Sequence, residues 1–474
     1  MASIYSPPRE HAALSFDDPG LLRAVVAGEA RLTLSQGLEL YRQMPLAGLG
    51  RWADARCRQL HGDSIRTYII DRNINYTNVC NARCTFCAFR RDATDADAYT
   101  LSKEKIHEKI AELVAIGGTQ ILMQGGMNPD LSIDYYLDLL SSIKQRFPGV
   151  HVHAFSPPEM VEFVHFFNPP GATFEDKVRW VMVKLRDAGL DSLPGGGGEI
   201  FAEPVRRKIG LGKCDAESWL TVMYVAHTLG MFTSATMMFG HIEGYADRVH
   251  HMGLVRKWQD RALSESLEGS EPRGHYKAFI TWPFQRENTP LGRVRDWGSD
   301  PSEFDRPFPG DEVARAFGWG ANPEVDYREL GATAAEFGRR VRMAGATEYL
   351  RTQSISRLML DNIYSIGSSW VTMGPHIGQV GLAFGASDMG SVMMEENVVS
   401  SAGTTYCLDE AVLCRLIRDA GFIPAQRNNT YDILNIHDGP ESPDRRVADW
   451  STHRARKTHQ EAPKQAKAVL TVSR

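Results

Sequence analysis

Hydrophobic positions along the chain recur at two spacings, and the spacing differs from region to region. Between residues 19 and 62, apolar residues such as Leu22, Val25 and Val26 recur at the spacing of a helix. A run of β-branched and aromatic residues at 67–71 then has the composition of a strand. The pattern predicts a helical N-terminal segment, residues 1–65, ahead of the main domain.

From residue 67 onwards, predicted strands and helices alternate. The predicted strands are residues 67–71, 118–124, 150–155, 191–193, 233–239 and 277–282. Predicted helices lie between them at residues 102–115, 133–147, 176–188 and 216–229, the first with Ser102 as its capping residue. Alternation of this kind indicates a parallel sheet. Repeated over this length, it predicts an α/β fold with a (β/α)8 TIM-type barrel, complete or partial, followed by a C-terminal extension.

Two stretches interrupt this alternation, and the composition changes near the end of the chain. Residues 261–275 are polar and charged, and residues 293–324 are rich in proline, glycine and aspartate. We expect both to be surface loops inserted into a barrel domain that spans residues 66–435. Residues 436–474 contain few large apolar side chains, which predicts a disordered tail.

Composition and charge limit the possible functions. The 474 residues are 43% hydrophobic, which is sufficient for a large core. The net charge of −5 leaves no basic excess to neutralise phosphates, so we expect neither a nucleic-acid nor a membrane partner. No apolar run approaches the roughly 18 residues of a membrane span, and the first ten residues lack the apolar stretch of a secretory signal. We therefore expect a cytoplasmic protein.

Cysteines are clustered in one short segment. Three of the seven, Cys80, Cys84 and Cys87, are spaced C-x3-C-x2-C. The odd total in a long chain argues against a disulfide framework. Thiolates bind soft metals and iron–sulfur clusters. Three thiolates on one loop can hold three irons of a cubane and leave the fourth iron open to a chelating ligand.

Two other interpretations of these cysteines remain. A structural zinc site needs four ligands, but no fourth cysteine is near and His107 has no partner. The cysteines could also be buried and inert. The spacing, the position after the first predicted strand, and Phe86 before the last cysteine are typical of the loop in radical S-adenosylmethionine (SAM) enzymes. The sequence therefore predicts one 4Fe–4S cluster with three cysteine ligands, and SAM bound to it.

Loops after other predicted strands contain further candidates. Gln124, Gly125 and Gly126 follow the next strand, and radical SAM enzymes use a comparable Gly–Gly turn to bind the amino group of SAM. Gly–Gly is also a common turn. Four glycines at 195–198 precede Glu199, a candidate partner for a sugar hydroxyl of SAM. A flexible linker and a plain surface glutamate are the alternatives.

Longer segments resemble one family of these enzymes. The general signal is at residues 74–89, and more specific segments are 153–159, 236–241, 368–374, 384–388 and 394–398. They resemble the radical SAM family that makes aminofutalosine and dehypoxanthine futalosine derivatives in menaquinone biosynthesis, and the related deazaflavin-forming synthases. The dehypoxanthine futalosine cyclase branch is favoured. The alternatives are aminofutalosine synthase, a deazaflavin (FO) synthase subunit, or a barrel without radical chemistry.

This resemblance implies a small-molecule substrate, in which a benzoate is joined through a ketone-bearing chain to a ribose. In a cyclase of this kind, the 5′-deoxyadenosyl radical abstracts the hydrogen at ribose C4′. The carbon radical closes a ring onto the benzoate, and loss of a proton and an electron restores aromaticity. A one-electron reductant such as flavodoxin or ferredoxin would supply the cluster.

The implied reaction needs a base for the proton and a cation for the benzoate. The candidate bases are His241 and Glu243, which end a predicted strand, and Asp388. The candidate cations are Arg206 and Arg207, just beyond Glu199. Each of these side chains has an ordinary surface or salt-bridge role as its alternative.

Overall fold

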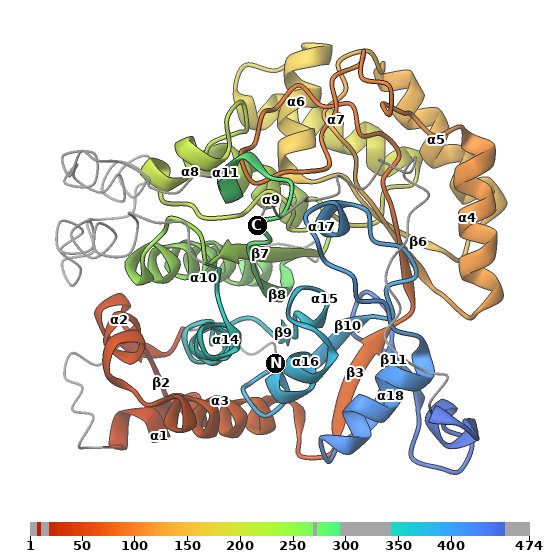
Figure 1. Cartoon of the computed structure of the whole chain (residues 1–474). Coiled ribbons are helices and arrows are strands. Elements are labelled where there is room, and N and C mark those ends of the chain that lie inside the picture. The colour runs from red at the N-terminus through yellow and green to blue at the C-terminus, as the bar shows by residue number, and fades with distance from the viewer. Residues whose placement is uncertain (1–6, 11–18, 269–272, 294–342, 451–474) are drawn as a thin grey trace, which may run out of the picture.

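Parallel strands form a closed ring at the centre of the molecule (Figure 1). The computed structural model describes residues 7–10, 19–268, 273–293 and 343–450. In order, the ring consists of β3–β4 (Ile65–Ile69 and Asp71–Ile74), β5 (Gln120–Met123), β6 (His151–Ala154), the bridge residues Ser192 and Leu193, β7 (Thr233–Phe239), β8 (Tyr276–Pro283), β9 (Ser365–Gly367) and β10 (Asp388–Ser391). Eight positions around the ring are thereby filled, as the TIM-type prediction requires.

The ring closes because β3 and β4 are two halves of one extended segment. The first half pairs with β10, where Thr67 lies opposite Asp388. The second half pairs with β5, where Asp71 lies opposite Gln120. On the far side, single bridges through residues 192 and 193 join β6 to β7. The predicted α/β barrel is therefore confirmed, and it is complete.

Helices cover the outside of the ring (Figure 1). The longer ones are α4 (Lys103–Ala115), α5 (Ile133–Arg146), α6 (Pro157–Phe167), α7 (Phe174–Ala188), α9 (Ala216–Thr228), α10 (Tyr245–Glu268) and α14 (Ala346–Met359). The shorter ones are α8 (Glu203–Ile209), α11 (Pro290–Arg293), α15 (Trp370–Met373), α16 (Pro375–Gly381) and α17 (Val398–Ser401). The Ser102 hydroxyl accepts a hydrogen bond from the Lys105 amide and caps α4, as the sequence predicts.

The N-terminal segment consists of three helices, α1 (Gly20–Ala27), α2 (Leu34–Gln43) and α3 (Leu46–His61), with a short two-stranded parallel sheet of β1 (Arg9–Glu10) and β2 (Ala30–Arg31). Arg31 attaches this segment to the barrel. Its guanidinium lies 2.6 Å from the carboxylate of Asp260 and 2.7 Å from that of Asp361. Because Arg31 and Asp361 are nearly fully buried, these ion pairs are little screened by solvent.

The C-terminal extension adds two strands outside the ring. After α18 (Glu410–Asp419), β11 (Ile423–Arg427) pairs in parallel with β3, and β12 (Ile433–Ile436) pairs antiparallel with β11. The chain then folds back, and the short helix η2 (Pro443–Arg446) places Asp444 2.7 Å from Arg418. The prediction of disorder from residue 436 is therefore wrong as far as residue 446. Polar contacts hold this stretch, and composition does not reveal them.

One predicted insertion is largely helix. α10 continues to Glu268, so residues 261–268 of the predicted loop 261–275 are helical. The next strand, β8, begins at Tyr276. The guanidinium of Arg261 lies 3.7 Å from the centre of the Tyr224 ring and is paired with Glu265 one turn along α10. A polar helix face was thus mistaken for a loop. The other predicted insertion, 293–324, lies outside the described residues except for Arg293.

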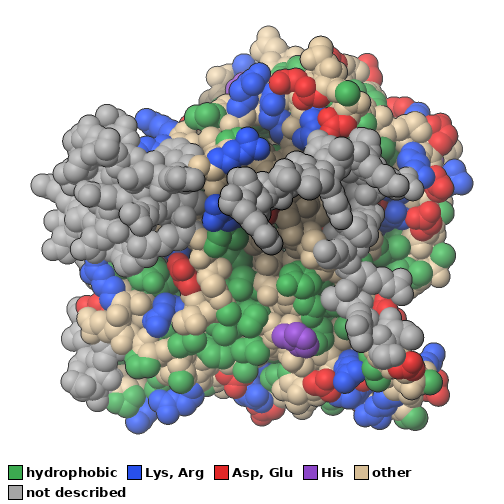
Figure 2. All heavy atoms as spheres, viewed as in Figure 1, with side chains coloured by type: hydrophobic (Ala, Val, Ile, Leu, Met, Phe, Trp, Pro, Cys, Tyr) green, Lys and Arg blue, Asp and Glu red, His purple; other side chains and the backbone are tan. Residues whose placement is uncertain are grey.

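The visible surface carries charges of both signs. Figure 2 shows acidic and basic side chains interspersed along the edges of this face, whereas hydrophobic side chains gather over α14, α15 and α16. Within the described part of the chain, no helix is long and apolar enough to cross a membrane.

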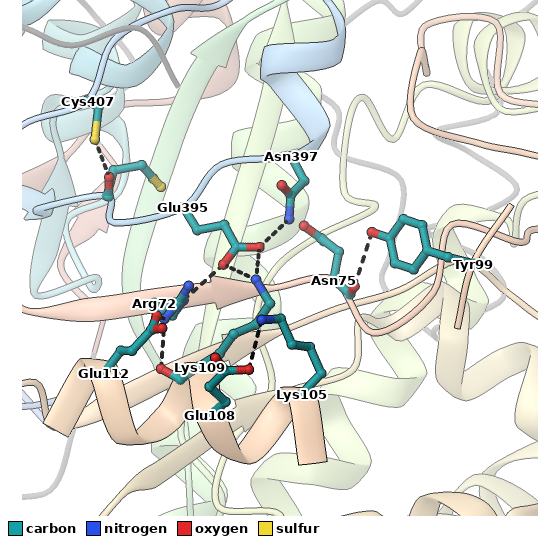
Figure 3. A network of polar contacts seen from close by, with 11 residues as sticks. Arg72, Asn75, Tyr99, Lys105, Glu108, Lys109, Glu112, Glu395, Asn397 and Cys407 are labelled. Atoms are coloured by element: carbon teal, nitrogen blue, oxygen red, sulfur yellow. Dashed lines mark hydrogen bonds and ion pairs between the residues drawn. The ribbon is translucent and has the colours of Figure 1, made fainter. Parts of the chain in front are cut away.

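A group of ion pairs fastens the segment after β10 to the barrel (Figure 3). The Glu395 carboxylate accepts hydrogen bonds from Arg72 of β4 at 2.9 Å and from Lys109 of α4 at 2.6 Å. It also accepts one from the amide of Asn397 at 3.0 Å. Since Glu395 is only 14% exposed, these interactions are stronger than those of a surface pair.

We predict that Glu395→Gln lowers the free energy of unfolding by about 2 kcal/mol, because it removes charge-assisted hydrogen bonds. Burial raises the pKa of Glu395, but Lys109, Asn397 and Arg72 more than offset this, and the folded-state pKa lies below the ordinary 4.5. The contribution is therefore complete above about pH 5 and is lost as the pH falls through the folded-state pKa.

Denaturant unfolding of both proteins from pH 7 to pH 3 measures this difference. Glu108→Gln is the matched control, because Glu108 pairs with Lys105 on the exposed face of α4 and both side chains are more than half exposed. The control should behave like the parent protein. A gap between Glu395→Gln and the parent that widens with acid would show that the sign is wrong.

Candidate active site

A cavity of about 500 Å³ runs from the loops at the carboxyl ends of the strands into the barrel. This is the end of a TIM-type barrel where active sites lie, and the volume is typical of a small-molecule site. Its lining combines residues of the loops with residues of the strands inside the barrel. The lining includes the predicted residues Cys80, Cys84, Phe86, Cys87, Gln124, Gly125, Gly126, Glu199 and Asp388, and also Asp71, His153, Glu159, Lys213, Lys277, Glu396 and Arg427.

The cysteine loop follows β4, and backbone hydrogen bonds hold it against two neighbouring segments. The amide of Asn81 donates to the carbonyl of Met127 at 3.0 Å. The amides of Arg83 and Thr85 donate to the carbonyls of Leu211 and Ile209, both at 2.8 Å. These contacts fix the path of the loop, and all three predicted cysteines face the cavity.

The remaining cysteines do not line this cavity. The Cys57 thiol lies 3.5 Å from the carbonyl of Ala386, and the Cys407 thiol lies 2.9 Å from that of Met393. Cys214 lies beside Arg206 and Cys414 packs in the core. These four positions have local packing contacts that account for them.

The chemistry of the three thiols suits a cluster better than a single ion. Burial raises the pKa of Cys84 to about 12 and also raises the pKa of Cys80, so these thiols lose their protons on binding metal. Among the described residues, no three His, Cys, Asp or Glu side chains converge closely enough to hold one metal ion. A cubane attaches its thiolates to different irons and needs a wider spacing than zinc does.

The Gly–Gly turn is required for a reason that the sequence did not indicate. The Gly126 amide donates to the carbonyl of Thr77 at 2.9 Å. A Cβ at Gly126 would lie 2.1 Å from the carbonyl oxygen of Val79, and one at Gly125 would lie 2.6 Å from the Tyr76 ring. The glycines therefore let the chain pack against itself beneath the cysteine loop. Both glycines also face the cavity. Their close approach to a ligand there remains a prediction.

Glu159 joins this turn to its surroundings. One carboxylate oxygen accepts hydrogen bonds from the Tyr76 hydroxyl at 2.8 Å and from the Gly125 amide at 3.1 Å. The other accepts from the amide and hydroxyl of Ser156 at 2.8 and 2.7 Å, which forms the capping box of α6. A single buried carboxylate thus links the end of β4, the Gly–Gly turn and the start of α6.

Glu199 has an unused acceptor in the cavity. Its backbone has a φ of 42°, and its Oε1 accepts a hydrogen bond from Lys213 at 2.8 Å. Oε2 is buried without a hydrogen-bond partner in the described structure. Buried acceptors are rarely left unpaired, so a ligand hydroxyl is a fitting donor at this position.

Lys213 is a functional candidate that the sequence reasoning missed. Besides pairing with Glu199, its ammonium lies 5.0 Å from the centre of the Phe86 ring. Burial lowers its pKa, but the charges of Glu199 and Cys84 more than offset this, and the lysine stays protonated. Nothing in its sequence context signals this role, because the contacts join three separate loops.

Arg206 and Arg207 do not line the cavity, which argues against their predicted role in binding a benzoate. Arg206 is buried and donates to the carbonyls of Gly197, Gly198 and Cys214 at 2.8 to 3.0 Å. It therefore positions the glycine-rich loop. The Arg207 side chain is 78% exposed and pairs with Glu203.

His241 and Glu243 also lie outside the cavity, which argues against their predicted role as bases. Glu243 accepts hydrogen bonds from the amides of Gly240 and His241 and pairs with Arg248 at 2.7 Å. The His241 imidazole lies 3.0 Å from the same carboxylate, and both side chains are fully buried. Gly240 follows β7 directly and has a φ of 84°. Because Arg248 belongs to α10, this cluster anchors that helix instead.

Asp388 does line the cavity, but its carboxylate is already paired. Arg427 donates two hydrogen bonds to it, at 2.6 and 2.9 Å, and the Thr67 hydroxyl donates a third at 2.6 Å. A proton acceptor here would have to give up one of these hydrogen bonds. Arg427 and Lys277 are cations of the inner cavity, and the sequence reasoning identified neither.

Comparisons with known proteins agree with this geometry. Residues 74–255 match the radical SAM superfamily, and residues 326–439 match the CofH/MqnC C-terminal region. A cyclic dehypoxanthine futalosine synthase of Halalkalibacterium halodurans is 37% identical over 89% of this chain and 96% of its own length. The chain belongs to the same radical SAM family. A synthase of the same name from Streptomyces coelicolor is 36% identical over 89% of this chain and 90% of the relative.

A solved structure shares the fold. The crystal structure of methylornithine synthase superposes with a TM-score of 0.55 and covers 85% of this chain and 97% of its own, at 17% identity. At that identity the likeness shows the fold alone. Membership of the radical SAM superfamily implies a 4Fe–4S cluster and SAM. The cysteine loop and the unpaired Glu199 oxygen fit these two groups.

We predict that Gly126→Ala lowers the free energy of unfolding by about 2 kcal/mol, because its Cβ must displace the backbone at Val79. The same Cβ would lie 2.9 Å from the Cβ of Cys80, so the iron content should fall as well. Denaturant unfolding and iron analysis after anaerobic reconstitution measure both effects. Gly149→Ala is the control, because a Cβ there meets nothing within 4 Å. A Gly126→Ala protein with full stability and full iron would contradict this packing argument.

Proposed function

We propose that the protein converts dehypoxanthine futalosine to cyclic dehypoxanthine futalosine in menaquinone biosynthesis. One observation carries the proposal. Each of the five segments by which the sequence resembles the cyclase branch contributes to the cavity that also contains the cysteines. The lining residues from these segments include His153, Thr236, Trp370, Asp388 and Glu396. The relatives that are 36–37% identical over 89% of the chain support the same reaction.

Cys80, Cys84 and Cys87 would hold the cluster, and the Gly–Gly turn and Glu199 would bind SAM. When bound, these two groups supply a 5′-deoxyadenosyl radical. Lys213 holds the Glu199 carboxylate in place through its 2.8 Å contact. Phe86 and Trp370 contribute apolar surface to the same cavity.

The inner cavity would hold the benzoate end of the substrate. Lys277 and Arg427 line it, and a carboxylate in a buried site needs a cation or hydrogen-bond donors. These two residues replace Arg206 and Arg207 as candidates. A one-electron reductant such as flavodoxin or ferredoxin would supply the electron that starts the reaction.

We predict that anaerobic reconstitution gives about four irons and four sulfides per chain. Replacing Cys80, Cys84 or Cys87 by alanine should abolish the cluster and its visible absorption. Cys214→Ser is the matched control, because Cys214 is also half-buried near the glycine-rich loop but does not line the cavity. Loss of iron from the control that equals the loss from Cys84→Ala would overturn the assignment of ligands.

The reaction itself is tested with dehypoxanthine futalosine deuterated at ribose C4′. We expect deuterium in 5′-deoxyadenosine, and cyclised product in about equal amount, because that hydrogen is the one abstracted. Mass spectrometry of both compounds gives the result. An aminofutalosine synthase or a deazaflavin synthase subunit would leave this substrate unchanged, so recovery of intact substrate from active, SAM-cleaving protein would reject the proposal.

A further inference from the structure

The proposed reaction, on which this inference rests, leaves one proton to be removed from the benzoate ring inside the barrel. Glu199 has an unpaired oxygen, but it lies with Lys213 at the cysteine end of the cavity, where it is assigned to SAM. The other carboxylates of the cavity are poorly suited to accept the proton. Both oxygens of Asp71 accept hydrogen bonds, from Ser391 and Gln120, and Asp388 is held by Arg427. Glu159 and Glu396 also accept hydrogen bonds on both oxygens.

His153 differs from these carboxylates because one of its two ring nitrogens is not occupied by a hydrogen bond. It lies on β6, faces the cavity and is 8% exposed. Its Nδ1 lies 2.6 Å from the Ser192 hydroxyl, whereas its Nε2 has no hydrogen-bond partner in the described structure and is not fully enclosed. Burial lowers the pKa of His153 well below its ordinary value, helped by the charges of His151 and Arg427, so the ring is neutral.

The Ser192 hydroxyl links His153 by hydrogen bonds to a second histidine, His151. It lies 2.7 Å from Nε2 of His151, which is two residues earlier on β6 and therefore projects from the same side of the strand. His151 is partly exposed but does not line the cavity. Beyond it, Asp191 is paired with Lys144, and both of these side chains are partly exposed. An unbroken hydrogen-bonded path thus leads from the cavity to a residue that solvent can reach.

We propose that Nε2 of His153 accepts the ring proton and that Ser192 and His151 conduct a proton out of the barrel. After ring closure, the attacked ring carbon still carries its hydrogen, and the ring has one unpaired electron. The C–H bond breaks, the proton goes to His153, and the electron goes to the iron–sulfur cluster, which gave up one electron when SAM was cleaved. The ring is then aromatic.

The hydrogen-bond network determines how the proton leaves. For Nε2 to be a free acceptor, Nδ1 of His153 carries the hydrogen and donates to Ser192, and Ser192 donates to His151. Once Nε2 is protonated, the Nδ1 proton passes to Ser192 as the hydroxyl proton passes to His151. His153 is left neutral, and the excess proton lies at the partly exposed end of the path.

The experiment is a single-turnover reaction of reconstituted protein with SAM and C4′-deuterated dehypoxanthine futalosine. In His153→Gln, deuterium should still reach 5′-deoxyadenosine, because abstraction precedes the step that needs the base. The ratio of cyclised product to deoxyadenosine should fall at least tenfold, because loss of a general base typically lowers the rate of its step about 10²- to 10⁴-fold. Ser192→Ala should lower the ratio less, because His153 remains. Substrate affinity of His153→Gln, measured by calorimetry, should stay within about threefold of the parent.

Chemical rescue separates a base from a structural role. In His153→Gly, added imidazole should raise the product ratio, and methylated imidazoles too large for the gap should not. His165→Gln is the control variant, because His165 is 61% exposed on α6 and should leave the ratio unchanged. If the His153 variants do not fold, Ser192→Ala and His151→Gln decide, and an unchanged product ratio in both overturns the proposal.

The two proposals fail in different ways. A parent protein that cleaves SAM but transfers no deuterium rejects the cyclase function. If the parent protein transfers deuterium and His153→Gln still forms about one cyclised product per 5′-deoxyadenosine, His153 is rejected as the base and the cyclase function stands. A His153→Gln protein that binds substrate but no longer transfers deuterium also rejects His153 as the base, because the residue would then act before the proton is lost.

Discussion

The hydrogen bonds of the buried Glu159 carboxylate are the interactions on which the cysteine end of the cavity depends. The carboxylate accepts four hydrogen bonds, from Tyr76, Gly125 and twice from Ser156. Burial raises its pKa and these donors oppose the shift. Its removal would leave all four donors without a partner in a dry site, and each such loss costs about 1–3 kcal/mol. The turn beneath the cysteine loop would then lose its support.

The cavity has two chemically distinct ends, which orients the proposed substrate. The cysteines, Glu199 and Lys213 lie toward the loops, whereas His153 and Arg427 lie along the strands. The ribose hydrogen must face the radical, and the carboxylate of the benzoate must meet a cation. On this proposal the ribose lies near the cluster and the aromatic ring lies deeper, where the base is placed. The C-terminal extension supplies Arg427, so the added strand β11 contributes to the site as well as to the sheet.

The sequence predicted the barrel because most of its strands are apolar runs between amphipathic helices. It did not predict β9 and β10, whose residues are Ser-Ile-Gly and Asp-Met-Gly-Ser, since short strands with small and polar residues have no periodic signal. The sequence could group the three cysteines because they are neighbours along the chain, and the structure shows that all three line one cavity.

The other site residues depend on side-chain direction, which local sequence does not specify. Arg206 and Arg207 are adjacent, yet one is buried against carbonyl groups and the other is 78% exposed. His241 and Glu243 end a barrel strand, as an active-site residue should, but they turn away from the cavity after Gly240. His153 was part of a predicted family segment, but only the spatial position of Ser192 distinguishes it from a core histidine.

The closing strand pair also constrains how the chain can be made. Thr67 and Asp388 contact each other across the closing pair of strands although they are 321 residues apart. At ribosomal rates of about 5–20 residues per second, β3 waits about 15 to 60 s before either of its neighbours β10 and β11 has been synthesised. During that time its backbone hydrogen-bonding groups form an open edge, which other unfolded chains can pair with. In a nascent chain with this topology, β3 therefore needs protection from such pairing until translation is nearly complete.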